Sequence, residues 1–206
     1  MDCLEGFKML GDNSIDLTVT SPPYDDLRTY NGYSFDFENI AKELYRVTKD
    51  GGVVVWVVGD KTKSGSETLT SFKQAIFFKE IGFRVHDTMI YRKNNPMPLN
   101  HNRYEQEFEY MFIFSKGKPK TFNPIKVPCK TAGQKYDYSK RKSASSKEIN
   151  SAGRSREEIK ATKNDKIKGN IWSYNVGINQ STKDRIAFKH PAIFPEKLAE
   201  DHILSW

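Results

Sequence analysis

The sequence predicts an α/β fold, in which helices alternate with the strands of one central sheet. Residues 15–20 are rich in β-branched side chains and are typical of a buried strand. Residues 53–58 are almost purely apolar, which is typical of a parallel strand that is covered on both faces. A helical pattern lies between these two runs, and the length of 206 residues suits one domain with room for an insertion.

Three segments show the spacing of apolar residues that is typical of helices, namely 2–10, 37–48 and 72–81. In the second of them, the apolar side chains share one face and the charged side chains can be solvated. We expect Asp50-Gly51-Gly52 to end this helix, because glycine is common just after a helix C-terminus. Gly82 closes the third segment in the same way.

The second half of the chain predicts two further ordered parts. Residues 83–92 and 108–115 are β-rich and read as the two strands of a hairpin. After a long polar stretch, order is expected again at 171–174. Residues 190–198 then lead into a helix, with Pro195 near its first turn.

Positive charge is concentrated in one part of the chain. The whole chain carries a formal net charge of +7, whereas residues 116–168 hold 16 Lys/Arg and 5 Asp/Glu, a local excess of 11 positive charges. The remainder is therefore net acidic, and the balance favours a polyanionic partner over a neutral one. Taken alone, the Ser-rich and basic residues 139–155 predict a disordered linker.

The cysteines and the hydropathy of the chain argue against a metal-binding, membrane-spanning or secreted protein. Cys3 and Cys129 lie far apart, without the spacing that is typical of zinc ligands, so no metal site is expected. A disulfide between them is neither required nor excluded. No apolar run approaches the length of a membrane span and no signal peptide is evident, which makes the cytoplasm the simplest compartment.

The most informative feature is Ser21-Pro22-Pro23-Tyr24, which directly follows the first predicted strand. Proline cannot donate a backbone hydrogen bond, and it pushes the preceding residue into an extended conformation. The carbonyl groups of Ser21 and Pro22 can therefore point out of the sheet edge, beside the flat ring of Tyr24. Hydrogen-bond acceptors next to an aromatic ring suit one task well, which is to hold the exocyclic amine of a flipped base.

Thr20-Ser21-Pro22-Pro23-Tyr24 resembles the catalytic motif of the DNA amino-methyltransferases, which methylate cytosine N4 or adenine N6 with S-adenosylmethionine. Taken alone, this motif also fits a strand-ending turn in an unrelated α/β protein. Three further parts of the chain resemble the same family. They are the helix, Gly-Gly turn and strand at 43–58, the late hairpin at 91–95 and 103–116, and His190-Pro191-Ala192-Ile193-Phe194-Pro195-Glu196-Lys197-Leu198. The first of these parts is shared by many related methyltransferases, whereas the spacing of the two prolines in the last is more specific.

The order of these segments resembles the permuted β class of the family, in which the catalytic half comes first and the methionine-binding half comes last. The resemblance implies a Rossmann-like S-adenosylmethionine-dependent methyltransferase sheet with a basic recognition insertion. It divides the chain into a catalytic part at 1–115, a target-recognition or DNA-binding region at 116–170, and a segment at 171–206 that leads into the cofactor-binding half.

In the family, a glycine-rich Asp-Pro-Phe-x-Gly-x-Gly loop follows the last segment and wraps the methionine end of the cofactor. The sequence ends at Trp206 before any such loop, and Gly-x-Gly does not occur at a predicted strand–helix junction. We therefore expect a partial sheet that lacks its first three strands. The chain is then either a fragment or one half of an enzyme that a second chain completes.

The resemblance also implies roles for the motif residues Ser21, Pro22, Pro23 and Tyr24. The Ser21 hydroxyl and the Pro22 carbonyl would accept hydrogen bonds from the target amine and so aim its lone pair at the methyl group. Tyr24 would stack on the flipped base, the alternative being a simple lid over the sheet edge. Serine at the first motif position favours cytosine N4 over adenine N6, because Asp-Pro-Pro-Tyr is the commoner form in adenine enzymes.

Contacts to the cofactor are implied at both ends of the chain. Asp2 corresponds to an acidic residue that accepts a hydrogen bond from the adenine amine of S-adenosylmethionine. It is also placed to cap the first helix, and one carboxylate can serve both purposes. Pro191, Phe194 and Pro195 correspond to residues near the methionine end, with Phe194 as an ordinary core residue as the alternative.

In the basic region, Lys140, Arg141 and Lys142 are the predicted contacts to double-stranded DNA, and a solvated loop is the alternative. A non-catalytic DNA-binding module of the same fold, or half of a split enzyme, is the main rival to an active methyltransferase. An RNA methyltransferase is less favoured. The sequence leaves open the recognition site, the oligomeric state and any restriction partner.

Overall fold

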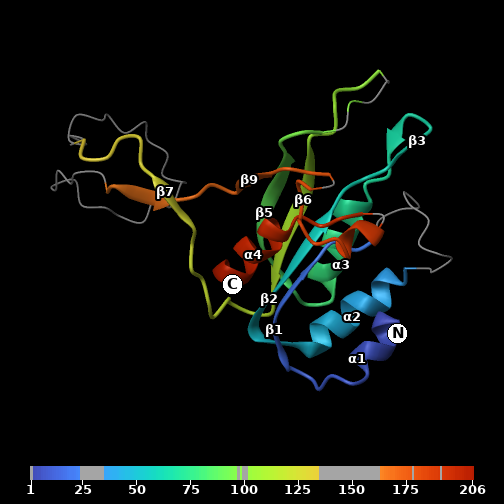
Figure 1. Ribbon diagram of the computed structural model, residues 1–206. Helices are drawn as coiled ribbons and strands as arrows, with labels where there is room; N and C mark the ends of the chain where they lie inside the picture. The colour runs from blue at the N-terminus through green and yellow to red at the C-terminus, as the bar shows by residue number, and fades with distance from the viewer. Residues whose placement is uncertain are drawn as a thin grey trace, which may run out of the picture. The chain divides into compact units, whose positions relative to one another are not determined.

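The computed structural model describes residues 2–23, 35–96, 98, 102–134, 163–177, 179–190 and 192–206. They belong to two compact units (Figure 1): Met1–Asn123 together with Gly169–Trp206, and Pro124–Lys168. The second unit lies within the predicted recognition region 116–170, whereas the C-terminal segment joins the first unit. Within the described ranges, every helix is too short or too polar to cross a lipid bilayer.

The first unit is built around a five-stranded mixed sheet with the strand order β1-β2-β6-β5-β9. Its strands are β1 (Ile15–Thr20), β2 (Thr48–Val58), β5 (Arg84–Lys93), β6 (Phe108–Ser115) and β9 (Ile171–Tyr174). β1 is parallel to β2 and β9 is parallel to β5, whereas β6 is antiparallel to both of its neighbours. The predicted α/β class, the first and last strands and the hairpin are therefore confirmed.

Helices cover both faces of this sheet. α1 (Cys3–Phe7), α2 (Phe37–Val47) and α3 (Thr70–Glu80) pack on one face, and α4 (Glu196–Ser205) packs on the other. All four were predicted, although α1 is shorter than expected; α4 starts directly after Pro195. The other described elements are short: the hairpin of β3 (Thr62–Lys63) and β4 (Ser66–Glu67), the 3-10 helix η2 (Ala187–Lys189) and, in the second unit, the hairpin of β7 (Lys126–Pro128) and β8 (Asp165–Ile167).

The glycine turn at residues 50–52 does not follow the end of a helix, which corrects the prediction. α2 ends earlier, at Val47, and β2 runs on through both glycines. Gly51 has a φ of 82°, a left-handed conformation that glycine adopts without strain, and its N–H donates to the Lys116 carbonyl at 2.6 Å. The register between β1 and β2 shifts across this turn, so the glycines form a bulge within the sheet.

Aromatic side chains fill the core between the sheet and helices α1 to α3. Trp56 of β2 and Phe114 of β6 contact Phe78 of α3, with ring centroids 5.0 Å and 4.4 Å from that of Phe78. All three side chains are almost fully buried, and the Trp56 Nε1–H donates to Gln74 Oε1 at 2.9 Å. Because burial of each such ring contributes about 2–3 kcal/mol, this cluster fixes α3 on the sheet.

α4 packs on the opposite face and sets the direction in which the C-terminal segment runs. The buried His202 ring stacks on Trp172 of β9 at a centroid distance of 4.7 Å, and Trp206 contacts His86 near the start of β5 at 5.5 Å. β5 runs in the same direction as β1 and β2, since β6 is antiparallel to both β2 and β5. The C-terminal end of α4 therefore lies at the amino ends of these strands, and its N-terminal end points to their carboxyl ends (Figure 1).

Tyr91 of β5 and Tyr174 of β9 lie between the sheet and α4, with ring centroids 5.9 Å apart. The Tyr174 hydroxyl donates to Asp201 Oδ2 at 2.8 Å, and Lys197 Nζ lies 2.9 Å from Asp201 Oδ1. The Tyr91 hydroxyl is buried without a hydrogen-bond partner among the described residues. Burial raises the pKa of both phenols, and Asp201 raises that of Tyr174 further. The unfolded chain therefore ionises first, and the stability of the fold should fall as the pH rises above about 10.

These tyrosines provide a matched pair of variants. We expect Tyr174→Phe to lower the free energy of unfolding by about 1–3 kcal/mol, because the buried Asp201 carboxylate loses a hydrogen-bond donor. Tyr91→Phe removes only an unpaired hydroxyl, so it should be neutral or slightly stabilising. Urea denaturation at pH 7, followed by circular dichroism, measures both. Equal losses in the two variants would contradict the role assigned to the Tyr174–Asp201 hydrogen bond.

Gly52 and Gly11 provide a second matched pair of variants. A Cβ atom at Gly52 would lie 2.9 Å from the Asp16 carbonyl oxygen and 3.0 Å from that of Lys49, whereas at Gly11 nothing lies within 4 Å. We expect Gly52→Ala to lower the free energy of unfolding by about 1–3 kcal/mol through overpacking at the bulge. Gly11→Ala should have little effect. A thermal midpoint that is the same for Gly52→Ala and the parent would show that the bulge relaxes without cost.

Candidate active site

β1, β2 and β5 end at the same edge of the sheet, here named the carboxyl edge, and the predicted catalytic motif lies there. Ser21, Pro22 and Pro23 directly follow β1; Ser21 is exposed, Pro22 is buried and Pro23 is half-buried. The Ser21 hydroxyl forms no hydrogen bond with other described residues. Because open α/β sheets bind ligands outside the carboxyl ends of their strands, this edge is the candidate active site.

Asp60, which follows β2 at the same edge, has a structural role. Its carboxylate accepts hydrogen bonds from the Ser71 N–H at 2.9 Å and from the Ser71 hydroxyl at 2.5 Å. Leu69, at the N-cap position of α3, offers no capping side chain of its own, so Asp60 caps the helix from outside it. Both carboxylate oxygens are engaged in this way, and they hold the N-terminal end of α3 at the carboxyl edge.

Asp2 fills one of its two predicted roles, since its Oδ1 accepts a hydrogen bond from the Leu4 N–H at 2.8 Å and so caps α1. Arg46, in the last turn of α2, donates to the carbonyls of Phe7 and Leu10 at 2.8 Å and 2.9 Å. The C-terminal ends of α1 and α2 therefore lie together. Because α2 ends at the start of β2, its N-terminal end points to the carboxyl edge, and Asp2 lies toward that edge as well. The contact of Asp2 with the cofactor stays a prediction.

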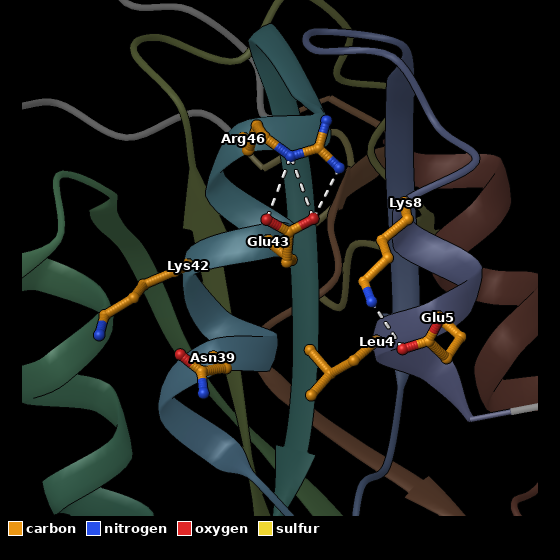
Figure 2. A pocket seen from close by; sticks show the side chains of 7 residues that line it. All are labelled: Leu4, Glu5, Lys8, Asn39, Lys42, Glu43 and Arg46. Carbon is orange, nitrogen blue, oxygen red and sulfur yellow. Dashed lines mark hydrogen bonds and ion pairs between the residues drawn. The ribbon is translucent and has the colours of Figure 1, made fainter.

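An open groove lies on the outer surface of α1 and α2 (Figure 2). Seven residues line it: Leu4, Glu5, Lys8, Asn39, Lys42, Glu43 and Arg46. Arg46 contacts both oxygens of Glu43, with Nε 3.1 Å from Oε1 and Nη2 2.6 Å from Oε2, and Lys8 Nζ lies 2.7 Å from Glu5 Oε1. The hydrogen bonds from the guanidinium hold the pKa of Glu43 below its usual range. These ion pairs lie within one helix each, whereas the hydrogen bonds from Arg46 to the carbonyls of Phe7 and Leu10 join α2 to the end of α1.

On the other face of the sheet, the start of α4 points to the carboxyl edge. Pro195 is buried at the N-cap position, and Phe194 before it is half-buried. The Glu196 N–H donates to the Ser181 carbonyl at 3.0 Å, and the Thr182 hydroxyl donates to Glu196 Oε2 at 2.9 Å. The Ser181 hydroxyl is itself buried without a hydrogen-bond partner in the described part of the chain. Such an orphaned group next to a helix N-terminus is a candidate ligand contact.

The sequence did not point to Ser181 or Thr182. They lie in a polar stretch of ordinary loop composition, ahead of the motif that was recognised. No periodicity or spacing marks them. Only the contact of this stretch with the first turn of α4 shows that both residues lie at the site.

The structure thus places Asp2, the segment Ser21-Pro22-Pro23 and the pair Phe194-Pro195 at one end of the first unit. Their chemical roles stay predictions. The other predicted site residues lie outside the described ranges; they are Tyr24, Pro191, Lys140, Arg141 and Lys142.

Known proteins resemble this chain over most of its length. The chain matches the N6/N4 family described as DNA methylase over residues 15–206. It is 57% identical, over 197 residues, to the orphan methyltransferase M.BamHII of Bacillus amyloliquefaciens, covering 96% of this chain and 73% of that relative. It is 26% identical, over 203 residues, to the type II methyltransferase M.BglII of Bacillus subtilis, covering 94% of this chain and 51% of the relative.

A solved structure supports the fold. The cytosine-N4-specific PvuII DNA methyltransferase aligns with a TM-score of 0.64 at 18% identity, covering 100% of this chain and 68% of that one. At this identity the likeness concerns the fold alone, and it confirms the predicted methyltransferase sheet. The family match and the identity to M.BamHII confirm the resemblance that the Ser-Pro-Pro-Tyr motif indicated. The chain belongs to the N6/N4 DNA methylases, the family of DNA amino-methyltransferases.

Proposed function

We propose that this chain carries the catalytic motif and the DNA-recognition region of an enzyme that methylates an exocyclic amine of a flipped base in double-stranded DNA. S-adenosylmethionine is the cofactor of this family. One observation carries the proposal: the exposed Ser21 hydroxyl and the two prolines after it stand at the carboxyl end of β1, in a chain that matches the family from residue 15 onward.

The chemistry sets the task of the motif. An exocyclic amine is a poor nucleophile, because its lone pair is delocalised into the ring. The Ser21 hydroxyl and the Pro22 carbonyl would accept hydrogen bonds from the amine, which favours a pyramidal nitrogen with its lone pair aimed at the methyl donor. Acceptors fixed in advance at a sheet edge act by positioning and by electrostatic preorganisation. Tyr24 would stack on the flipped base and offset part of the few kcal/mol that flipping costs.

The residues at the edge fit part of what the cofactor requires. Bound there, S-adenosylmethionine supplies an electrophilic methyl group on a sulfonium sulfur. Asp2 uses Oδ1 for its capping bond, which leaves Oδ2 as an acceptor for an adenine amine. At the start of α4, the orphaned Ser181 hydroxyl and the positive end of the helix dipole suit the carboxylate of a methionine group, next to Phe194 and Pro195.

We further propose cytosine N4 as the target atom. The support is the serine at the first motif position, Ser21, where adenine N6 enzymes more often have aspartate. Nucleoside analysis of the methylated product decides this point directly. The methyl group is expected on cytosine N4, and N6-methyladenine as the sole product would contradict the assignment.

The open edge of the sheet supports a proposal about partners. In the described part of the chain β1 pairs only with β2, so its outer edge presents unpaired backbone groups. The chain spans about half to three quarters of the length of the two curated relatives. We propose that a further segment, from the same polypeptide or a second chain, pairs with β1 and completes the cofactor site.

The first test concerns this completion. The 206-residue chain should bind S-adenosylmethionine weakly or not at all, because tight binding in such folds relies on a glycine-rich strand–helix turn and the sequence holds no Gly-x-Gly. Adding the part of M.BamHII that the alignment does not cover, as a fusion or as a second chain, should restore binding. Isothermal titration calorimetry measures both. Micromolar binding by the chain alone would show that Asp2, the motif and the start of α4 already form a sufficient pocket.

The second test concerns Ser21 in the completed enzyme. Ser21→Ala should lower kcat for methyl transfer to unmethylated viral DNA by about 10²-fold, as loss of one preorganised contact does elsewhere. The stability of the fold should not change, because the hydroxyl is exposed and bonds no other described residue. Ser173→Ala, an exposed serine on β9, is the matched control. Normal turnover in Ser21→Ala would remove the serine from the mechanism and leave the carbonyl as the remaining acceptor.

A further inference from the structure

Two segments extend beyond the carboxyl edge next to the proposed active site (Figure 1). The β3–β4 hairpin leaves the sheet after β2 and returns to the start of α3, and the connection from β5 to β6 leaves at the same edge. Arg103 of that connection joins them: it donates to the Gly65 carbonyl in the hairpin turn, and its Nη1 lies 3.9 Å from Glu67 Oε1. We name residues 61–68 and 102–107 together the edge arm.

The hairpin part of the arm is a tight, well-defined turn. Ser64 and Gly65 both have positive φ angles, 50° and 80°, as two-residue hairpin turns of this kind require. Thr62 pairs with Glu67 across the hairpin. Its tip therefore holds a fixed shape, and Lys63 projects from it with an exposed side chain that has no ion pair among the described residues.

The other part of the arm presents an aromatic ring. Tyr104 is 100% exposed, the highest value among the exposed large hydrophobic side chains of the described residues. It directly follows Arg103, which the hairpin holds in place. A single exposed apolar residue needs no explanation on a protein surface. Here, however, the exposed ring stands on an anchored segment beside the proposed active site. In that position it can stack on a base of the bound DNA.

The side chains of the arm suit nucleic acid. Lys63 pairs with Ser66 across the hairpin and lies between Thr62 and Ser64 in the sequence, and lysine, serine and threonine are common contacts to phosphate oxygens. The arm also holds three acidic residues, Glu67, Glu105 and Glu107. Glu67 lies 3.9 Å from Arg103 and Glu107 lies 3.6 Å from Arg92, so cations of the protein offset these two charges. A tyrosine ring stacks on any base, because every base offers a π-face. Cation, hydroxyls and ring together match a DNA strand whose target base has left the stack.

We propose that the edge arm is a second DNA-contact surface, separate from the basic recognition region, in which Lys63 contacts a phosphate near the target nucleotide and Tyr104 stacks on a base beside the gap that the flipped base leaves. Arg103 is a positioning residue that holds the two parts of the arm together. This inference rests on the proposed function, because it takes double-stranded DNA as the ligand.

Salt dependence of DNA binding tests the role of Lys63. Fluorescence anisotropy of the 206-residue chain with a labelled duplex is measured at several salt concentrations for the parent, Lys63→Ala, Lys63→Arg and Lys79→Ala. Lys79 lies in the last turn of α3, near the opposite end of the sheet, and is an exposed control. Loss of one phosphate contact should reduce the slope of log K against log salt by about 1 in Lys63→Ala only. A slope in Lys63→Ala equal to that of the parent overturns the phosphate contact.

A duplex with one mismatch tests Tyr104, since a mismatched base is easily unstacked. Tyr104→Ala should weaken binding to this duplex by about 5- to 150-fold, the range that loss of one base–aromatic stack produces. Tyr104→Phe keeps the ring and should bind within about twofold of the parent on the same grounds. Binding by Tyr104→Ala within twofold of the parent, or equal losses in the two variants, overturns the stacking role.

The edge arm and the proposed function can be overturned separately. If the completed enzyme methylates DNA while Lys63→Ala and Tyr104→Ala bind as the parent does, only the edge arm is overturned. If both variants lose DNA binding as expected and the completed enzyme transfers no methyl group, only the proposed function is overturned. Near-UV circular dichroism of each variant confirms that the exposed substitutions leave the fold intact.

Discussion

β2 is buried on both of its faces, and the arrangement of the first unit follows from that constraint. Its side chains from Val53 to Val58 are at most 2% exposed. Successive side chains of a strand point to opposite faces, so Val54, Trp56 and Val58 meet α2 and α3, and the alternate valines face the side of α4. A strand of this kind is stable only when helices cover both sides of the sheet. The carboxyl edge is therefore enclosed by the start of α4 on one face and by α1 to α3 on the other.

The sequence predicted those elements whose signal is local. The apolar run of β2, the single buried face of α2 and the β-rich strands of the hairpin are strong local patterns. α2 and the hairpin appear near their expected bounds, whereas β2 starts at Thr48, before the predicted run 53–58. The prediction for the glycine pair at 51–52 was wrong, because a helix end and a strand bulge use the same property of glycine. What distinguishes them here is the bond from the Gly51 N–H to the Lys116 carbonyl, a contact between residues far apart in sequence. Composition cannot show such a contact.

Residues at the carboxyl edge differ in how strongly the sequence marks them. The motif at Ser21 was found because two consecutive prolines after a strand are chemically distinctive. Ser181 belongs to a polar segment without a pattern, and its position depends on a contact with the first turn of α4. Tyr104 lies in the segment 103–116 that resembles the family, but nothing in that resemblance shows its exposure or its closeness to the β3–β4 hairpin. An exposed fraction or an unpaired hydroxyl becomes visible only when the neighbours are known. The functional residues of a sheet edge come from several connections, so no single stretch of sequence contains them.

Two kinds of DNA contact would then serve different steps of one reaction. A basic region with an excess of 11 positive charges would contribute affinity by counterion release, which does not depend on where the reacting atom lies. The edge arm belongs to the same compact unit as Ser21, so any contact it makes with the duplex has a fixed relation to the motif. Binding energy that is realised only when the DNA is correctly placed can offset the cost of flipping a base, whereas diffuse attraction cannot. A rigid arm beside the catalytic edge is therefore better suited to position the target nucleotide than an equal number of lysines elsewhere on the surface.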